Sequence, residues 1–190
     1  MTLRERGQKM KKGLFILIAL SAVLFIAEQA TAQTGITNSG HDMRSLLGIN
    51  EICVPCHTPH NAIEDAGYPL WNRAAHESGI FPGSGPASQV CLSCHDGTVA
   101  VDSYGGNEGS IFLTGDALID STGEHHPIGA SAVYEVGPDY HPISDDTSPV
   151  KTFNSQVECS SCHNAHNSEF GNFLAETMEG SLLCLTCHNL

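Results

Sequence analysis

The sequence has few basic side chains, and most of them lie near its N-terminus. Five of the eight Lys and Arg residues precede residue 13, whereas Asp and Glu number 21 in the whole chain. Residues 33–190 alone keep three basic and 19 acidic side chains, a net charge of −16. Because negative charge repels phosphate backbones and anionic lipids, we expect neither nucleic acid nor an anionic membrane as a partner.

Long apolar runs are also scarce. The longest, residues 13–27, has fifteen residues, and a membrane-spanning helix needs about 20. Basic residues precede this run and the small-x-small site Ala30-Thr31-Ala32 follows it, as in a secretory signal peptide. One alternative is an uncleaved membrane anchor, for which this run is short. Another is a lipid anchor, which would need a cysteine at the cleavage site. We predict that residues 1–32 are a signal peptide and that residues 33–190 form an exported protein without a membrane span.

The predicted mature chain has little from which to build a core. The whole sequence has only one tryptophan but 19 glycines and nine prolines, and few segments show helix or strand periodicity. Small scaffolds of this kind need another source of stability, such as a metal or covalent cross-links.

No cysteine is spare, because all eight occur in four C-x-x-C-H motifs. Zinc would not require histidine after every second cysteine, and a disulfide between cysteines three apart closes too small a ring to stabilise the chain. Covalent c-type haem requires this arrangement each time, with two thioethers and a proximal histidine. We predict four haems, attached through Cys53, Cys56, Cys91, Cys94, Cys159, Cys162, Cys184 and Cys187, with His57, His95, His163 and His188 as proximal iron ligands.

The motifs form an internal repeat. "EICVPCHTPHNA" at 51–62 aligns with "VECSSCHNAHNS" at 157–168, and a second motif follows each. We predict a tetrahaem domain over 33–190 made of two dihaem repeats, about 33–115 and 116–190. The fold class is mostly irregular coil with short α-helices at the motifs and around 174–187, a loop over 96–116, and little or no β-sheet. The coil would wrap a stack of four haems that supplies most of the buried surface.

Each iron also needs a distal ligand, and seven histidines lie outside the motifs. Only two methionines follow residue 32, so bis-histidine ligation is expected. His60 and His166 cannot reach the far face of the haem beside them, so we expect each to ligate the second haem of its own pair. His126 precedes a proline that holds it in extended backbone, with His141 and His125 as substitutes. His76 is expected to be an exposed histidine rather than a ligand.

The segments "GHDMRS" at 40–45, "PLWNR" at 69–73, "CLSCHDGTVA" at 91–100 and "HPIG" at 126–129 join the motifs in a resemblance to multihaem cytochromes with doubled C-x-x-C-H motifs. The sequence is most similar to the OmcE-type extracellular tetrahaem cytochromes. This resemblance implies four stacked bis-histidine haems in a conductive extracellular filament, with one distal histidine supplied by the neighbouring subunit. By position it assigns His41, His60, His126 and His166 as distal ligands.

These patterns predict an electron carrier rather than an enzyme. The acidic surface would suit basic redox partner proteins, and a fourth haem near the end of the chain would favour head-to-tail self-association through an arm that carries His41. The alternatives are a monomeric periplasmic shuttle and a multihaem reductase. A reductase needs an open iron position, and the surplus of histidines argues against one.

The motif count generates the first testable prediction. The intact mass of the exported protein should exceed that of the 158-residue polypeptide by four haems. A mass showing three or fewer haems on fully matured protein would contradict the count.

Overall fold

The structure is a computed structural model, and it describes residues 35–63, 68–74, 76–120, 125–143 and 147–189. All of these belong to one compact unit, residues 34–190. The predicted signal peptide lies outside the described residues. Within the described ranges, no helix is long and apolar enough to cross a membrane.

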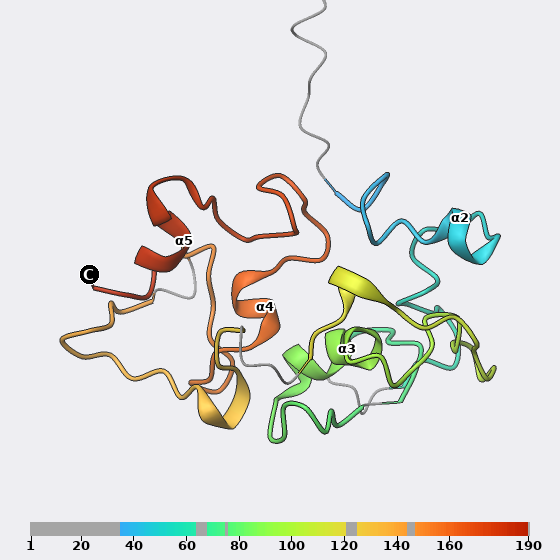
Figure 1. Cartoon of the computed structure of the whole chain (residues 1–190), viewed down its shortest axis with the longest axis horizontal. Coiled ribbons are helices and arrows are strands. Elements are labelled where there is room, and N and C mark those ends of the chain that lie inside the picture. The colour runs from blue at the N-terminus through green and yellow to red at the C-terminus, as the bar shows by residue number, and fades with distance from the viewer. Residues whose placement is uncertain (1–34, 64–67, 75, 121–124, 144–146, 190) are drawn as a thin grey trace, which may run out of the picture. The chain divides into compact units, whose positions relative to one another are not determined.

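Short helices separated by coil make up the fold (Figure 1). The described residues form no extended strands, and their β-structure consists of isolated bridges. The expectation of mostly coil with short helices and little β-sheet is confirmed. The helices are α2 (Arg44–Leu47), α3 (Pro86–His95), α4 (Cys159–Cys162) and α5 (Leu182–Leu185), with the 3₁₀ turns η2 (Gly115–Ala117), η3 (Gly129–Ser131) and η4 (Glu179–Ser181).

The helices coincide with the motifs, as expected, but not everywhere. The second motif ends α3, the third forms α4 and the fourth overlaps α5, whereas Cys53–His57 makes only a turn. The helix expected over 174–187 is limited to η4 and α5. Gly180 and Ser181 have φ of 60° and 62°, and this left-handed backbone interrupts a right-handed helix.

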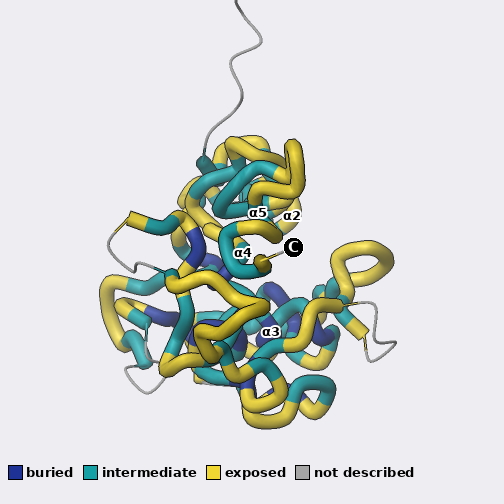
Figure 2. Tube along the Cα trace, turned by 90° about the vertical axis from the view of Figure 1, so that its left-hand side faces the viewer, coloured by how far each residue is buried: buried dark blue, intermediate teal, exposed yellow. Residues whose placement is uncertain are grey.

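The longest helix, α3, has clear local causes. Gly85 at its N-cap is extended, and Pro86 takes the first helical position, where its missing N–H costs nothing. One face buries Ala87, Ser88, Leu92 and Ser93. Several of the buried residues lie in or near this helix (Figure 2).

The buried interior is small and largely polar. Six apolar side chains are buried among the described residues, against nine polar or charged ones. Large apolar side chains, in contrast, remain exposed on the polypeptide. They are Leu46, Leu70, Phe112, Leu118, Val133, Val136, Tyr140, Phe170, Met178, Leu182 and Leu185. The chain therefore offers more apolar surface to a bound group than it packs against itself.

A buried carboxylate joins the second and third motifs. Glu158, at the start of α4, accepts a hydrogen bond from the Gly85 N–H at 2.8 Å and another from the Ser88 hydroxyl. The Ser88 hydroxyl in turn accepts from the Cys159 N–H at 2.8 Å, and the Ser160 hydroxyl donates to the Ala87 carbonyl at 2.8 Å. These bonds hold α4 against α3 (Figure 1).

The segments after the first and third motifs fold back in the same way. The Thr58 N–H donates to the Leu70 carbonyl at 2.8 Å, and the Asn164 N–H donates to the Phe173 carbonyl at 2.7 Å. These two folded-back segments form the isolated β-bridges His57–Trp71 and His163–Leu174. This likeness accords with the sequence repeat, while the repeat boundaries stay a prediction.

Gly129 occupies a position that allows no side chain. Its φ is +66°, and a Cβ there would lie 2.7 Å from Ser84 Cα and 2.9 Å from the Gly83 oxygen, both backbone atoms. We expect Gly129→Ala to destabilise the haem-loaded protein by about 2 kcal/mol or more, since left-handed strain and overpacking add.

Denaturant unfolding followed by haem absorbance measures this loss. Gly137→Ala is the matched control, because a Cβ at Gly137 meets nothing within 4 Å and its backbone is not left-handed. Equal losses in the two variants would contradict the close packing described at Gly129.

Candidate functional site

Each motif outside α3 closes one helical turn around its own cysteines. The histidine N–H donates to the carbonyl of the first cysteine, at 2.8 Å for His57, 3.0 Å for His163 and 2.9 Å for His188. His95 ends α3 and so shares helical backbone with its cysteines. Residues i, i+3 and i+4 of a helical turn lie on one side, so each turn presents two thiols and an imidazole together.

Backbone carbonyls orient three of the four motif imidazoles. Nδ1 lies 3.1 Å from the Pro69 oxygen in His57, 2.7 Å from the Ala117 oxygen in His95 and 2.9 Å from the Asn172 oxygen in His163. A carbonyl can only accept, so it fixes the proton on Nδ1 and leaves Nε2 free as a metal ligand. Sequence patterns miss these carbonyls because they are backbone atoms supplied by distant segments.

The structure brings three of the four proposed distal histidines to motif histidines. The ring centroids are 6.0 Å apart for His41 and His95, 6.1 Å for His57 and His166, and 6.3 Å for His126 and His188. The planes of the His57–His166 pair lie within 16°, whereas those of the other two pairs cross at 62° and 63°.

These spacings fit an iron between two imidazoles. With metal–nitrogen bonds of about 2.0 Å, two opposed rings have centroids roughly 6 Å apart. His41 is largely buried, and burial followed by the neighbouring His95 lowers its pKa, which favours the neutral form that binds metal. The residues present therefore fit bis-histidine haem at three positions.

Two expectations about these histidines differ from the geometry. His166 was expected to serve the second motif of its own repeat, but its ring faces His57 in the first motif of the other repeat. His41 was expected to reach a neighbouring subunit, but it lies beside His95 of its own chain. These ring contacts arise because the coil crosses between repeats, and sequence spacing does not record such crossings. A role for His41 across a subunit boundary stays a prediction.

The other histidines are not paired in this way. In the described part of the chain, no second imidazole makes a ring contact with His163, the third motif histidine. His60 and His141 are exposed, and His125 packs edge-on to Phe81 with ring centroids 6.3 Å apart. The structure therefore does not bring His60 to either motif histidine of its own repeat.

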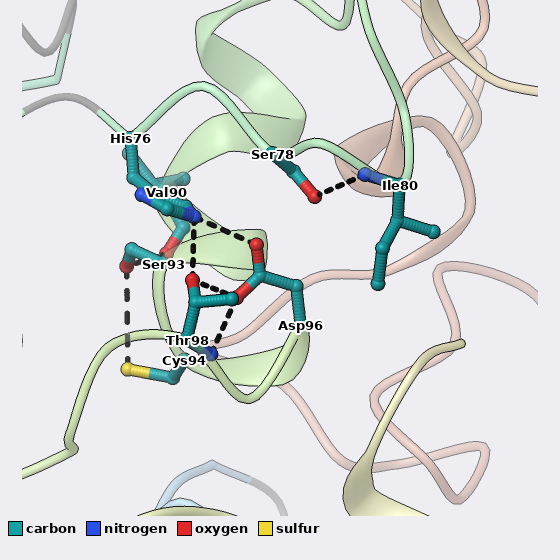
Figure 3. Close-up of polar contacts among 8 residues, drawn as sticks. All are labelled: His76, Ser78, Ile80, Val90, Ser93, Cys94, Asp96 and Thr98. Carbon is teal, nitrogen blue, oxygen red and sulfur yellow. Dashed lines mark hydrogen bonds and ion pairs between the residues drawn. The ribbon is translucent and has the colours of Figure 1, made fainter. Parts of the chain in front are cut away.

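His76 is engaged elsewhere, as Figure 3 shows. Its Nε2 lies 2.6 Å from Asp96 Oδ2 and 2.9 Å from the Thr98 hydroxyl. Burial raises the pKa of Asp96, but bonds from Thr98 and His76 outweigh it, so that this pKa lies below its ordinary value. The expectation that His76 is not an iron ligand agrees with this geometry, because Nε2 already has partners.

Thiols of consecutive motifs lie close together. Cys91 and Cys159 share a hydrogen bond, which raises the pKa of Cys91 and lowers that of Cys159. Cys94 lies near Cys56, and Cys187 lies near Cys162. Groups attached at these thiols would follow one another in the chain order of the motifs.

Burial also decides when attachment is easiest. It is the main cause that raises the pKa of Cys56 to about 11 and that of Cys162 to about 11, with the neighbouring thiols second. The eight thiols form no disulfides, but buried, protonated thiols react slowly. At Cys56 and Cys162, attachment is therefore favoured before these thiols become buried.

Sequence reasoning also missed two charged residues beside the thiols. Arg73 donates to the Cys94 sulfur at 3.1 Å, and Glu158 precedes Cys159 and binds the N-terminus of α3. Arg73 lies in the segment "PLWNR" and is one of three basic residues after residue 32, and Glu158 lies in the repeat segment "VECSSCHNAHNS". Neither pattern indicates that the charge is buried beside a thiol.

Comparison with known proteins adds one finding. Residues 151–189, which hold the third and fourth motifs, match the family described as doubled CXXCH motif. No curated protein matches the chain. The match covers the second motif pair, and the first pair has the same C-x-x-C-H pattern. It supports the family of multihaem c-type cytochromes with doubled C-x-x-C-H motifs, and covalently bound haem as the cofactor.

Proposed function

We propose that the chain is an electron-transfer cytochrome that holds four c-type haems and assembles into an extracellular filament resembling the OmcE type. The observation that carries the proposal is the set of three imidazole pairs, each made of one motif histidine and one histidine from elsewhere, at 6.0 to 6.3 Å. When bound, haem supplies a one-electron iron couple, whose potential bis-histidine ligation lowers relative to His/Met.

The chain's own residues perform three tasks in this proposal. The eight motif cysteines would hold the groups covalently, and the motif histidines would bind iron through Nε2, three of them oriented by backbone carbonyls. His166, His41 and His126 would supply the second histidine ligands beside His57, His95 and His188. Two histidine ligands at each of these irons would leave no place for a substrate, so the ligand set supports a carrier and disfavours a reductase.

The missing second ligand at His163 supports the filament proposal. The repeat equivalent of His166 is His60, and His166 serves the first motif of the other repeat, so His60 is the matching candidate for His163. His60 is exposed and makes no ring contact in the described chain. We infer that His60 of a second copy completes this position. A head-to-tail joint of this kind extends into a filament when its rotation does not close a ring.

The alternatives differ in how that position is completed. In a monomeric periplasmic shuttle, His60 would reach His163 within the same chain. In a reductase, the iron at His163 would stay open after assembly and bind nitrite or cyanide. His141 and His125 remain the substitutes for His126 as a distal ligand.

The intrachain pairs predict where ligand loss acts. We expect His166→Ala, His41→Ala and His126→Ala each to keep four attached haems and to make one iron high-spin, at the first, second and fourth motif respectively. Haem NMR or EPR of each purified variant assigns the affected site. His76→Ala is the matched control, and in assembled protein it should leave all irons low-spin, as in the wild type. If His166→Ala alters the fourth motif, the cross-repeat pairing is wrong.

Dilution of the assembled protein distinguishes the filament proposal from the shuttle alternative. In dissociated wild-type chains we expect one high-spin iron in four, which becomes low-spin as filaments appear by negative-stain microscopy. His60→Ala should keep that iron high-spin and prevent filaments. Fully low-spin wild-type monomers that need His60 would favour the shuttle, and an iron that binds nitrite in assembled protein would favour the reductase.

A further inference from the structure

Arg73 places a positive charge beside the thiols of the first two motifs. It is only 7% exposed, and its guanidinium donates to the Pro55 oxygen at 2.8 Å, the Val101 oxygen at 3.3 Å and the Cys94 sulfur at 3.1 Å. Burial and Cys94 raise the pKa of the Cys56 thiol, and the Arg73 charge partly offsets this rise. Among the described residues it has no carboxylate partner, because the ion pairs there are Arg44–Asp42 and His76–Asp96.

Glu158 places a negative charge at the next junction. It is 1% exposed, and it lies between α3, which carries Cys91, and Cys159 of the third motif. Both carboxylate oxygens accept, one from the Gly85 N–H and one from the Ser88 hydroxyl. The Ser88 proton is committed to Glu158 because the Ser88 oxygen itself accepts from Cys159. Two donors and no acceptor around the group are the environment of an ionised carboxylate.

Both charges are shielded from water, so they act at greater strength than surface charges. Salt screens exposed charges within about 10 Å, whereas buried charges are screened much less. A nearby cation favours the reduced state of a redox centre, because reduction lowers the positive charge at the metal. An anion favours the oxidised state for the same reason.

We propose that Arg73 and Glu158 are positioning charges that set a potential step along the haem row, raising the first motif site and lowering the third. The inference rests on the proposed function, since it assumes haem at each motif. The second motif site lies between the two charges, with Cys94 near Arg73 and Cys91 hydrogen-bonded to Cys159, so the opposing effects meet there. A partly reduced chain then keeps its electrons on the side of the first motif.

Potentiometric titration with haem NMR assignment tests the step. In wild-type protein the first motif site should have the higher midpoint potential and the third the lower. Glu158→Gln keeps the size and accepting oxygen of the side chain but removes its charge. We expect it to raise the reduced-to-oxidised ratio of the third site about tenfold at fixed potential, which is about 59 mV for one electron.

Arg73→Gln should lower that ratio at the first site by a similar factor, while Arg73→Lys, which keeps the charge, should leave it within about threefold of wild type. Matched controls that remove exposed charges are Lys151→Gln and Glu108→Gln, and neither should change the reduced-to-oxidised ratio at any site by more than about threefold. Loaded, low-spin Glu158→Gln protein with unchanged midpoints would overturn the proposal. So would a reversed order of the first and third sites in wild type, which tests the idea even if Arg73→Gln does not fold.

Haem count and spin state separate this inference from the proposed function. If wild-type protein lacks four attached haems or has open irons after assembly, the proposed function fails. If the haem count and spin state are as expected but the midpoint potentials do not change when the two charges are removed, only the inference fails.

Discussion

The hydrogen bond from each motif histidine N–H to the carbonyl of its first cysteine is the constraint on which the other features depend. It is local, it needs five residues, and it places two thiols and an imidazole on one side of a helical turn. A rigid group attached there fixes the chain at three points. The carbonyls of Pro69, Ala117 and Asn172 then come from distant segments to orient the imidazoles.

Directional polar contacts, rather than a large apolar core, join the repeats. Glu158, Ser88 and Gly85 form a chain of donors and acceptors between α3 and α4. The net free energy of such bonds is modest, but a missing partner is costly. A Cβ at Gly85 would lie 2.8 Å from the Glu158 carboxylate oxygen. The junction is thus specific in geometry while contributing little hydrophobic free energy.

What the sequence could predict follows from how local each feature is. The C-x-x-C-H turns and the scarcity of sheet depend on neighbouring residues, and both could be anticipated. The break at Gly180 and Ser181 could not, since serine rarely adopts left-handed backbone. The ring contact of His166 with His57 could not be anticipated, because it depends on the path of the coil between repeats. The burial of Glu158 is likewise a tertiary property. In a sequence with many acidic residues, no local pattern indicates which carboxylate will be buried.

The closeness of thiols from consecutive motifs has a consequence for protein quality control. Cys91 and Cys159 already share a hydrogen bond, and Cys56 and Cys162 each have a thiol of the next motif nearby. In an oxidising compartment such neighbours convert readily to disulfides. A chain that folded before receiving its haems would cross-link adjacent motifs and become a dead-end product. In such a compartment, maturation is therefore a competition between thioether formation and oxidation.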